Sequence, residues 1–223
     1  MEVDNQLGLG DAMLLIHQSI GRGVHMSGLY CRIFMRAGLP GGKIGPGFID
    51  YTRSLMSVLH AHHLAEDELE FPLFRDLLPE APYKQMAEEH RRIRPIVDEI
   101  RLKIERAVEA PESAETLERT DSLLTRLEEI WKPHIAVEEA HFSSAKIDAV
   151  MSPEEQTRLL ARIGEANQEH SGPDYLVLPF TLFNLPQKDR ASMSHLMPPV
   201  VTRHLIPVAW KEKWQPMAPF LLV

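Results

Sequence analysis

The stretch HAHHLAEDELEFP, residues 60–72, places three histidines beside a run of acidic residues within a little over three helical turns. In a bundle helix, apolar residues that recur in alternating steps of three and four mark the face that points inward. The inward seam through this stretch consists of Leu55, Leu59, His62, Glu66, Leu69 and Leu73. This register predicts that His62 and Glu66 are buried and that His63 and Asp67 flank the seam. His60 is also expected to flank it, and the rest of EDELE is expected to form a solvated face.

Three other stretches have the same alternating spacing of three and four residues, and each has a histidine where an aliphatic residue is expected. Helices are predicted at about residues 10–37, 47–78, 83–110 and 114–149, because glycine- and proline-rich segments separate these ranges. Short connections make consecutive helices antiparallel, which predicts an all-α fold with an up-down-up-down four-helix bundle. The further seam residues are His17, His90, His134 and Glu138. His25 competes with His17 in the first helix, in a less apolar register.

The two seam carboxylates need a partner that carries positive charge. A buried carboxylate without one costs several kcal/mol, and two of them would exceed the net stability of a domain, about 5–15 kcal/mol. In each HxxxE pair, a nitrogen and an oxygen donor lie one turn apart on the same helix face, where both can reach one ion or two adjacent ions. The sequence therefore predicts a site for polyvalent cations with the ligands His17, His62, Glu66, His90, His134 and Glu138.

Four motifs follow one another in the chain: the early His17, HxxxE followed by FP at 62–72, EH at 89–90 and HxxxEE at 134–139. This series, over about residues 10–148, resembles the hemerythrin-like, or HHE cation-binding, proteins. The resemblance implies a four-helix bundle that holds two iron ions in an Fe–O–Fe centre. It also implies that the two carboxylates bridge the irons and that the histidines cap them. Members of that family bind O2 reversibly, sense oxygen or iron, or act in oxidative chemistry.

The sequence departs from the oxygen-carrying branch of that family, which has five histidines and an HxxxH pair in the third helix. Here Arg94 lies one turn after His90, so six ligands are evident and more coordination positions stay open for water, peroxide or substrate. His141 is a candidate for the missing nitrogen ligand. Manganese could replace iron at such a site, and zinc suits the same donors in a misloaded sample.

The expected domain organisation is a bundle over residues 8–149 and a helical extension over residues 150–223 that packs on it. SPEEQ, residues 152–156, predicts a capping box and a fifth helix that runs to about His170. The segments beyond it are apolar, aromatic and rich in proline, and they need a surface to cover them. We expect the extension to roof the metal site or to form a homodimer contact.

Composition limits the remaining function classes. A net charge of −8, a pI near 5.8 and dispersed basic residues argue against nucleic acid and anionic membranes as partners. The single Cys31 suits a reducing compartment, and the acidic N-terminus does not resemble a secretory signal, so a cytoplasmic location is expected. The expected partner is O2 or peroxide. The functions left open are a binder of O2, an oxidase, oxygenase or peroxide-consuming enzyme, and an iron- or oxygen-sensing interaction module.

Overall fold

The computed structural model describes residues 7–109 and 114–223, and these residues form helices and connecting loops without any strand. The elements are α1 (Leu9–Ala37), α2 (Ile44–Ala65), η1 (Glu66–Glu70), α3 (Phe71–Leu77), α4 (Tyr83–Glu109), α5 (Ala114–His141), α6 (Ser144–Asp148), α7 (Pro153–His170), α8 (Asp174–Phe183), α9 (Gln187–Ser194), η2 (Val201–Ala209), α10 (Lys211–Trp214) and η3 (Gln215–Phe220). The all-α prediction is confirmed. The predicted end of the fourth helix at residue 149 is wrong, because α5 ends at His141 and α6 is separate. Residue 110, the predicted end of the third helix, lies outside the described residues.

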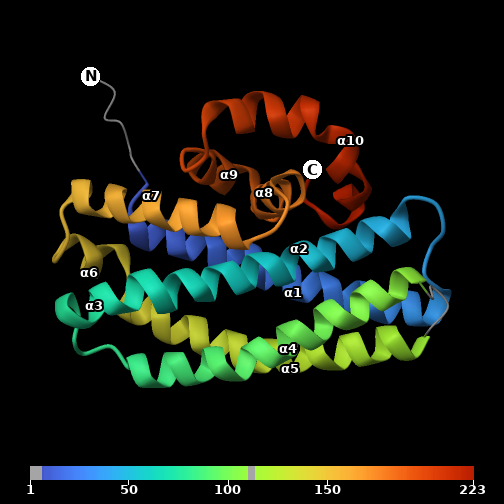
Figure 1. The fold of residues 1–223 in the computed structure, drawn as a ribbon, viewed down its shortest axis with the longest axis horizontal. Coiled ribbons are helices and arrows are strands. Elements are labelled where there is room, and N and C mark those ends of the chain that lie inside the picture. The colour runs from blue at the N-terminus through green and yellow to red at the C-terminus, as the bar shows by residue number, and fades with distance from the viewer. Residues whose placement is uncertain (1–6, 110–113) are drawn as a thin grey trace.

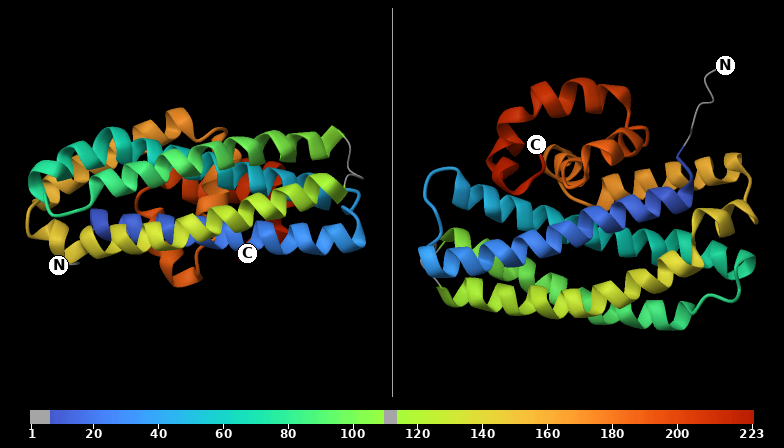
Figure 2. Two further views of the ribbon diagram at one scale, coloured as in Figure 1. Left: turned by 90° about the horizontal axis from the view of Figure 1, so that it is seen from below. Right: turned by 180° about the vertical axis from the view of Figure 1, so that it is seen from behind.

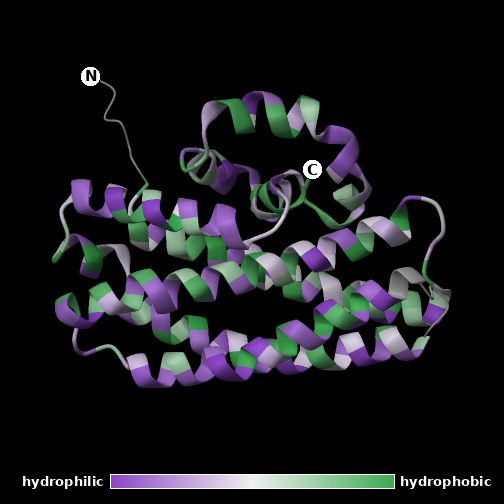
Figure 3. Ribbon diagram, in the orientation of Figure 1, coloured by the Kyte–Doolittle hydropathy of each residue, from purple (hydrophilic) through white to green (hydrophobic). Residues whose placement is uncertain are grey.

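Four long helical segments lie side by side: α1, α2 with its continuation through η1 and α3, α4, and α5 (Figure 1). Their contacts run from α1 to α2, from α2 to α4, from α4 to α5 and from α5 back to α1, so the four segments enclose a common interior. Polar and apolar residues alternate around each of them (Figure 3). None of the described helices combines the length and the apolar character that a membrane crossing requires.

The helix that contains residues 60–72 changes register at Glu66. Residues Glu66–Glu70 form a π-helix, in which the backbone N–H of Phe71 donates to the carbonyl of Glu66. A π-helical turn contains one more residue than an α-helical turn, so every later side chain is rotated around the axis. The predicted seam position Leu73 is therefore wrong, because Leu73 is 37% exposed, whereas Leu69 is half-buried and packs against the apolar core.

The C-terminal segment lies over the face of the bundle formed by α1 and α2, away from α4 and α5 (Figures 1 and 2). α7, α8 and η3 all contact α2, and α8 and α9 also contact α1. The predicted fifth helix is confirmed as α7, with a capping box in which Ser152 and Glu155 bond each other's backbone N–H groups. This packing buries Leu176, Phe180 and Phe220, among others, whereas Val200 and Val208 stay exposed.

A polar cluster fastens this segment to the bundle. The side-chain oxygen of Asn184, which follows α8, accepts hydrogen bonds from the Arg22 guanidinium at 2.5 Å and from the Tyr51 hydroxyl at 2.7 Å. Arg22 also donates to the backbone carbonyl of Phe220 at 2.8 Å. Asn184 and Tyr51 are buried and Arg22 is half-buried, so the Tyr51 hydroxyl has little access to water.

We expect Asn184→Leu to destabilise the protein by about 2–3 kcal/mol, because the buried Tyr51 hydroxyl and the half-buried Arg22 guanidinium lose their shared acceptor. For a chain of this size, that corresponds to a fall in Tm of about 4–12 °C in a thermal melt. The exposed Gln187→Leu introduces the same side chain at the start of α9 and should leave Tm unchanged. Equal Tm values for the two variants would contradict a role for this cluster in docking the segment.

Candidate metal centre

A polar layer divides the interior of the bundle into two apolar clusters. One cluster includes Ile20, Leu59, Ile93 and Leu127, and the other includes Met13, Phe71, Met86 and Phe142. Along each long helix, the histidines and carboxylates lie between residues of these two clusters. All the layer side chains are at most 7% exposed: His17 on α1, His62 and His63 on α2, Glu66 on η1, His90 on α4, and His134 and Glu138 on α5. The structure thus brings the six predicted ligand residues together and adds His63.

The donor atoms of this layer form two groups that share Glu66. In each group, one ligand atom from every residue lies within 4.8 Å of the others. The first group contains His17, His62, Glu66 and Glu138, and the second contains His63, Glu66, His90 and His134. Histidine nitrogens and carboxylate oxygens at this spacing suit iron, manganese or zinc.

Glu66 presents one carboxylate oxygen to each group. Its Oε1 lies 3.3 Å from Nε2 of His62, and its Oε2 lies 3.4 Å from Nε2 of His90. Glu66 is the first residue of the π-helix, and π-bulges occur often at functional sites.

Glu138 has the same arrangement from the opposite side. Its Oε2 lies 3.3 Å from Nε2 of His17, and its Oε1 lies 3.1 Å from Nε2 of His134. Two carboxylates that each face both groups are suited to bridge two ions.

Three histidines are oriented by carboxylates on neighbouring helices. The Nδ1 atoms lie close to the acids in three pairs: His17 with Glu139 at 3.1 Å, His90 with Asp67 at 2.9 Å, and His134 with Glu89 at 2.9 Å. When Nδ1–H donates to a carboxylate, Nε2 keeps its lone pair free for a metal, as in many metal sites. Sequence reasoning missed this role for the three acids. Each stands directly beside a predicted ligand in the chain, which is the signal that could have found them.

Several buried atoms of the layer have no hydrogen-bond partner among the described residues. They are Nε2 of His17, His62 and His63 and both carboxylate oxygens of Glu66 and Glu138. In addition, Nε2 of His90 and Nε2 of His134 lie only 3.0 Å apart. If both of these rings donate through Nδ1, two lone pairs face each other. Cations would satisfy all of these atoms together, so the residues fit a metal centre.

Burial and charge set the protonation of this layer when no ion is bound. Burial, and next the charge of Glu138, raise the pKa of Glu66 well above its ordinary value. Burial alone would also raise the pKa of Glu138, but the close approach of the His134, His17 and His90 imidazoles holds it well below its ordinary value. Burial lowers the pKa values of His62 and His63 well below 6.5, so both rings are neutral at pH 7 and able to bind metal.

His63 is the main difference between the predicted and the observed site. The heptad register predicts that it flanks the seam, but its side chain is 7% exposed and its ring stacks on that of His90, with ring centroids 4.0 Å apart. The side chains of His62 and His63 both face the layer, because the layer extends across the α2–α4 boundary as well as across the bundle axis. A single heptad seam assigns only one of two adjacent residues to the interior.

His25 and His141 lie outside both donor groups. His25 is exposed, whereas His17 is 1% exposed. His141 is half-buried, and its Nδ1 lies 2.8 Å from the backbone carbonyl of Val137. Arg94, one turn after His90, lies 3.9 Å from Asp67, the acid that contacts His90.

Glu70 contradicts the expectation of a solvated EDELE face. The π-helix turns its side chain inward, where it is 5% exposed. Burial, followed by the charge of Glu138, raises the pKa of Glu70 to about 7. A buried carboxyl group with this pKa can hold or release a proton near neutral pH.

Comparison with known proteins agrees with this geometry. The Hemerythrin HHE cation binding domain model matches residues 34–145, half of the chain. The match contains every residue of the layer except His17, which precedes it. Searches of curated proteins and of solved structures gave no match. With this match over half of the chain, and with a buried layer of histidines and carboxylates that fits a metal site, the chain belongs to the hemerythrin HHE cation-binding family.

Proposed function

We propose that the chain is a non-haem di-iron protein that binds O2 or a related small oxidant. One observation supports this proposal most strongly: Glu66 and Glu138 each direct one oxygen toward each donor group. A single ion would need only one oxygen from each carboxylate, whereas a dinuclear centre uses both oxygens of both carboxylates.

The two ions would have unequal ligand sets. His17 and His62 supply nitrogen to one ion, and His63, His90 and His134 supply nitrogen to the other, with both carboxylates shared. Iron prefers six ligands in many such sites, so the ion beside His17 and His62 has more open positions for a small molecule. When bound, an iron pair supplies electron transfer to or from such a molecule.

The chain's own residues then control protons and water. The carboxylates of Glu139, Asp67 and Glu89 fix the histidine tautomers from outside the layer. Glu70 is buried beside the layer and holds a proton near pH 7. The two apolar clusters exclude bulk water from both ends of the centre.

A second candidate is an oxidase, oxygenase or peroxide-consuming enzyme that acts on a small organic molecule. The observation that favours it is a cavity of about 590 Å³ whose wall includes His62 and Glu70. If the chain only binds O2 or a related oxidant, that small molecule alone reaches the centre. If the chain is an enzyme, a larger organic molecule lies against His62.

Metal analysis and an optical spectrum of aerobically purified full-length protein test the proposal. We expect about two iron ions per chain and the absorption bands of a coupled ferric pair. After reduction, a spectrum that forms and disappears as O2 is cycled supports binding, and consumption of an added organic co-substrate supports the enzyme. Protein that takes up only one ion per chain during anaerobic iron loading would contradict a dinuclear centre.

A further inference from the structure

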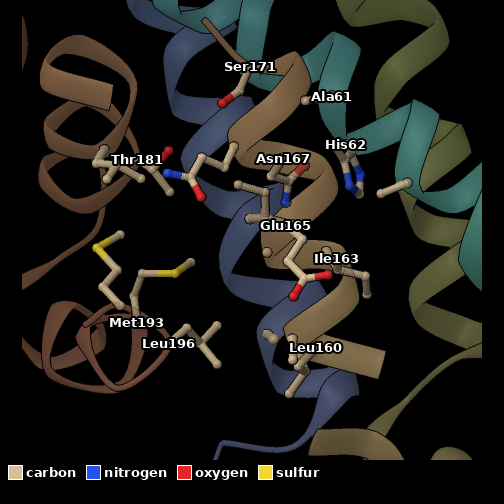
Figure 4. Close-up of a pocket in the computed structure, with 18 of the residues that line it drawn as sticks. Ala61, His62, Leu160, Ile163, Glu165, Asn167, Ser171, Thr181, Met193 and Leu196 are labelled. Atoms are coloured by element: carbon tan, nitrogen blue, oxygen red, sulfur yellow. The ribbon is translucent and has the colours of Figure 1, made fainter. Parts of the chain in front are cut away.

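The cavity lies between the bundle and the C-terminal segment, on the opposite side of His62 from the polar layer. Residues of α1, α2, α7, α8 and α9 line it (Figure 4). Its volume of about 590 Å³ falls within the range of small-molecule sites, about 300–1,000 Å³. Without the C-terminal segment, this space would be open solvent above α1 and α2.

The floor of the cavity is apolar and buried. Leu9 and Met13 of α1, Val58 of α2, Val177 of α8 and Met193 of α9 are all at most 7% exposed. Methionine side chains adapt to ligands of irregular shape and contact aromatic rings favourably. The floor therefore suits an apolar body, and its flexible methionines suit a ring system.

The charges on the wall disfavour anionic ligands, and the exposed imidazole of His195 is the one lining group besides His62 that can become cationic among the described residues. No lysine or arginine occurs among the lining residues within the described part of the chain, whereas Glu70, Glu165 and Asp174 are all present. An anionic group in the cavity would be buried without a cation and close to carboxylates. Fatty acids, which carry a carboxylate, do not fit these charges. Nucleotides and other phosphate compounds do not fit them either.

Residues of α7 form the mouth of the cavity. Ala161, Gly164, Glu165 and Gln168 of α7 line the cavity and are exposed, so they mark its opening to solvent. The half-buried Asn167 of the same helix also lines the cavity (Figure 4). Its amide offers both a donor and an acceptor to the polar end of a ligand.

We propose that this cavity binds an uncharged, mainly apolar organic molecule that contains a ring system and ends in a hydrogen-bonding group near Asn167. The bound molecule lies against the ring of His62. The site goes beyond the proposed function, because the cavity residues form it whether or not iron occupies the layer.

Two fluorescent probes with the same aromatic body test the proposal. N-phenyl-1-naphthylamine is uncharged, and 8-anilinonaphthalene-1-sulfonate adds a sulfonate to it. We expect the uncharged probe to bind the full-length protein with a stoichiometry of about one and at least about tenfold more tightly than the anionic probe, because burying a charge without a partner is unfavourable. Equal affinities would overturn the proposal.

Gly164→Trp places a large side chain in the mouth without a backbone conflict. Gly164 lies within α7, and a Cβ added there meets no atom within 4 Å. This variant should weaken binding of the uncharged probe at least about tenfold, since the indole fills the opening. Arg162→Trp is the matched control, because Arg162 is exposed on the same helix and does not line the cavity. Unchanged binding by a Gly164→Trp protein with wild-type circular dichroism would overturn the proposal.

The titrations are performed on both metal-free and iron-loaded protein, which separates this site from the proposed function. Probe binding by both forms supports the cavity site. Iron loading without probe binding overturns the cavity site and leaves the di-iron proposal standing. Probe binding by a chain that takes up no iron supports the cavity site and contradicts the di-iron proposal.

Discussion

Glu66→Gln should remove half or more of the bound metal and leave the metal-free protein at least as stable as the wild type. Glutamine replaces one anionic oxygen by an NH2 group, so only one of the two donor groups keeps a ligand at this position. In metal-free protein, burial and the charge of Glu138 raise the pKa of Glu66, which favours the protonated, uncharged carboxyl. Glutamine has the same shape and no charge, so below about pH 4.5, where the carboxyl is protonated in the folded and the unfolded chain, the free energy of unfolding should change by less than about 1 kcal/mol.

Two measurements check this expectation: metal content after dialysis and thermal melts with and without metal. A ligand present at about 1,000 times its Kd stabilises the folded state by about 4 kcal/mol, or about 8–16 °C in Tm for a chain of this size. Wild-type protein should show a gain of this order on metal loading, and Glu66→Gln less than half of it. The exposed Glu68→Gln, in the same π-helix, is the control and should behave as wild type. Full metal content in Glu66→Gln would contradict the bridging role of Glu66.

The pH dependence of the metal-free protein gives an independent check with a defined sign. The pKa of Glu66 is raised by folding, so its folded state binds a proton more tightly than the unfolded chain does. Stability from this group is complete below its ordinary pKa of 4.5 and is lost as the pH rises through the raised value. Glu70 acts in the same direction, so the difference between wild type and Glu66→Gln isolates Glu66. That difference should shift in favour of Glu66→Gln as the pH rises above about 4.5.

The sequence predicts the layer residues well because the inward face of a regular helix is a local property. His17, His90 and His134 each replace an aliphatic residue in an unbroken seam, and the structure buries all three. The same reasoning fails after Glu66, because the π-helix adds a residue to the turn. The spacing of the apolar residues does not indicate that insertion, so the pattern alone places Glu70 in solvent and Leu73 in the interior.

Features that depend on how helices are rotated against one another could not be predicted from single seams. The pair His90–Asp67 joins α4 to η1, and its geometry requires the relative rotation and height of the two helices. The cavity depends on α7 and α8 lying across α1 and α2, which the proline-rich sequence of the extension left open. Adjacent residues such as His62 and His63 present a related difficulty. A heptad seam assigns one of them to the interior, and whether the other is also buried depends on the surrounding helices.

His63→Ala should reduce the metal content toward one ion per chain, although the heptad register places His63 outside the seam. The second donor group consists of His63, Glu66, His90 and His134, so the variant removes one of its three nitrogens. It also removes the ring that stacks on His90 at 4.0 Å. In competition with a chelator, the ion of the second donor group should be lost first. The affinity for this ion should fall by more than the roughly 10–100-fold that is typical when a residue that only hydrogen-bonds to a ligand is lost.

Two variants on neighbouring positions make this result specific to coordination. Asp67→Asn removes the carboxylate beside Nδ1 of His90 and should weaken metal binding by about 10–100-fold. His60→Ala removes a half-buried histidine of the same helix that belongs to neither donor group, and it should retain both ions. Added imidazole should restore the second ion to His63→Ala, because it can occupy the space that the ring left, and should not restore it to Asp67→Asn. If His63→Ala and His60→Ala bind equal amounts of metal, His63 packs against His90 without coordinating, and the second ion depends on His90, His134 and the two carboxylates alone.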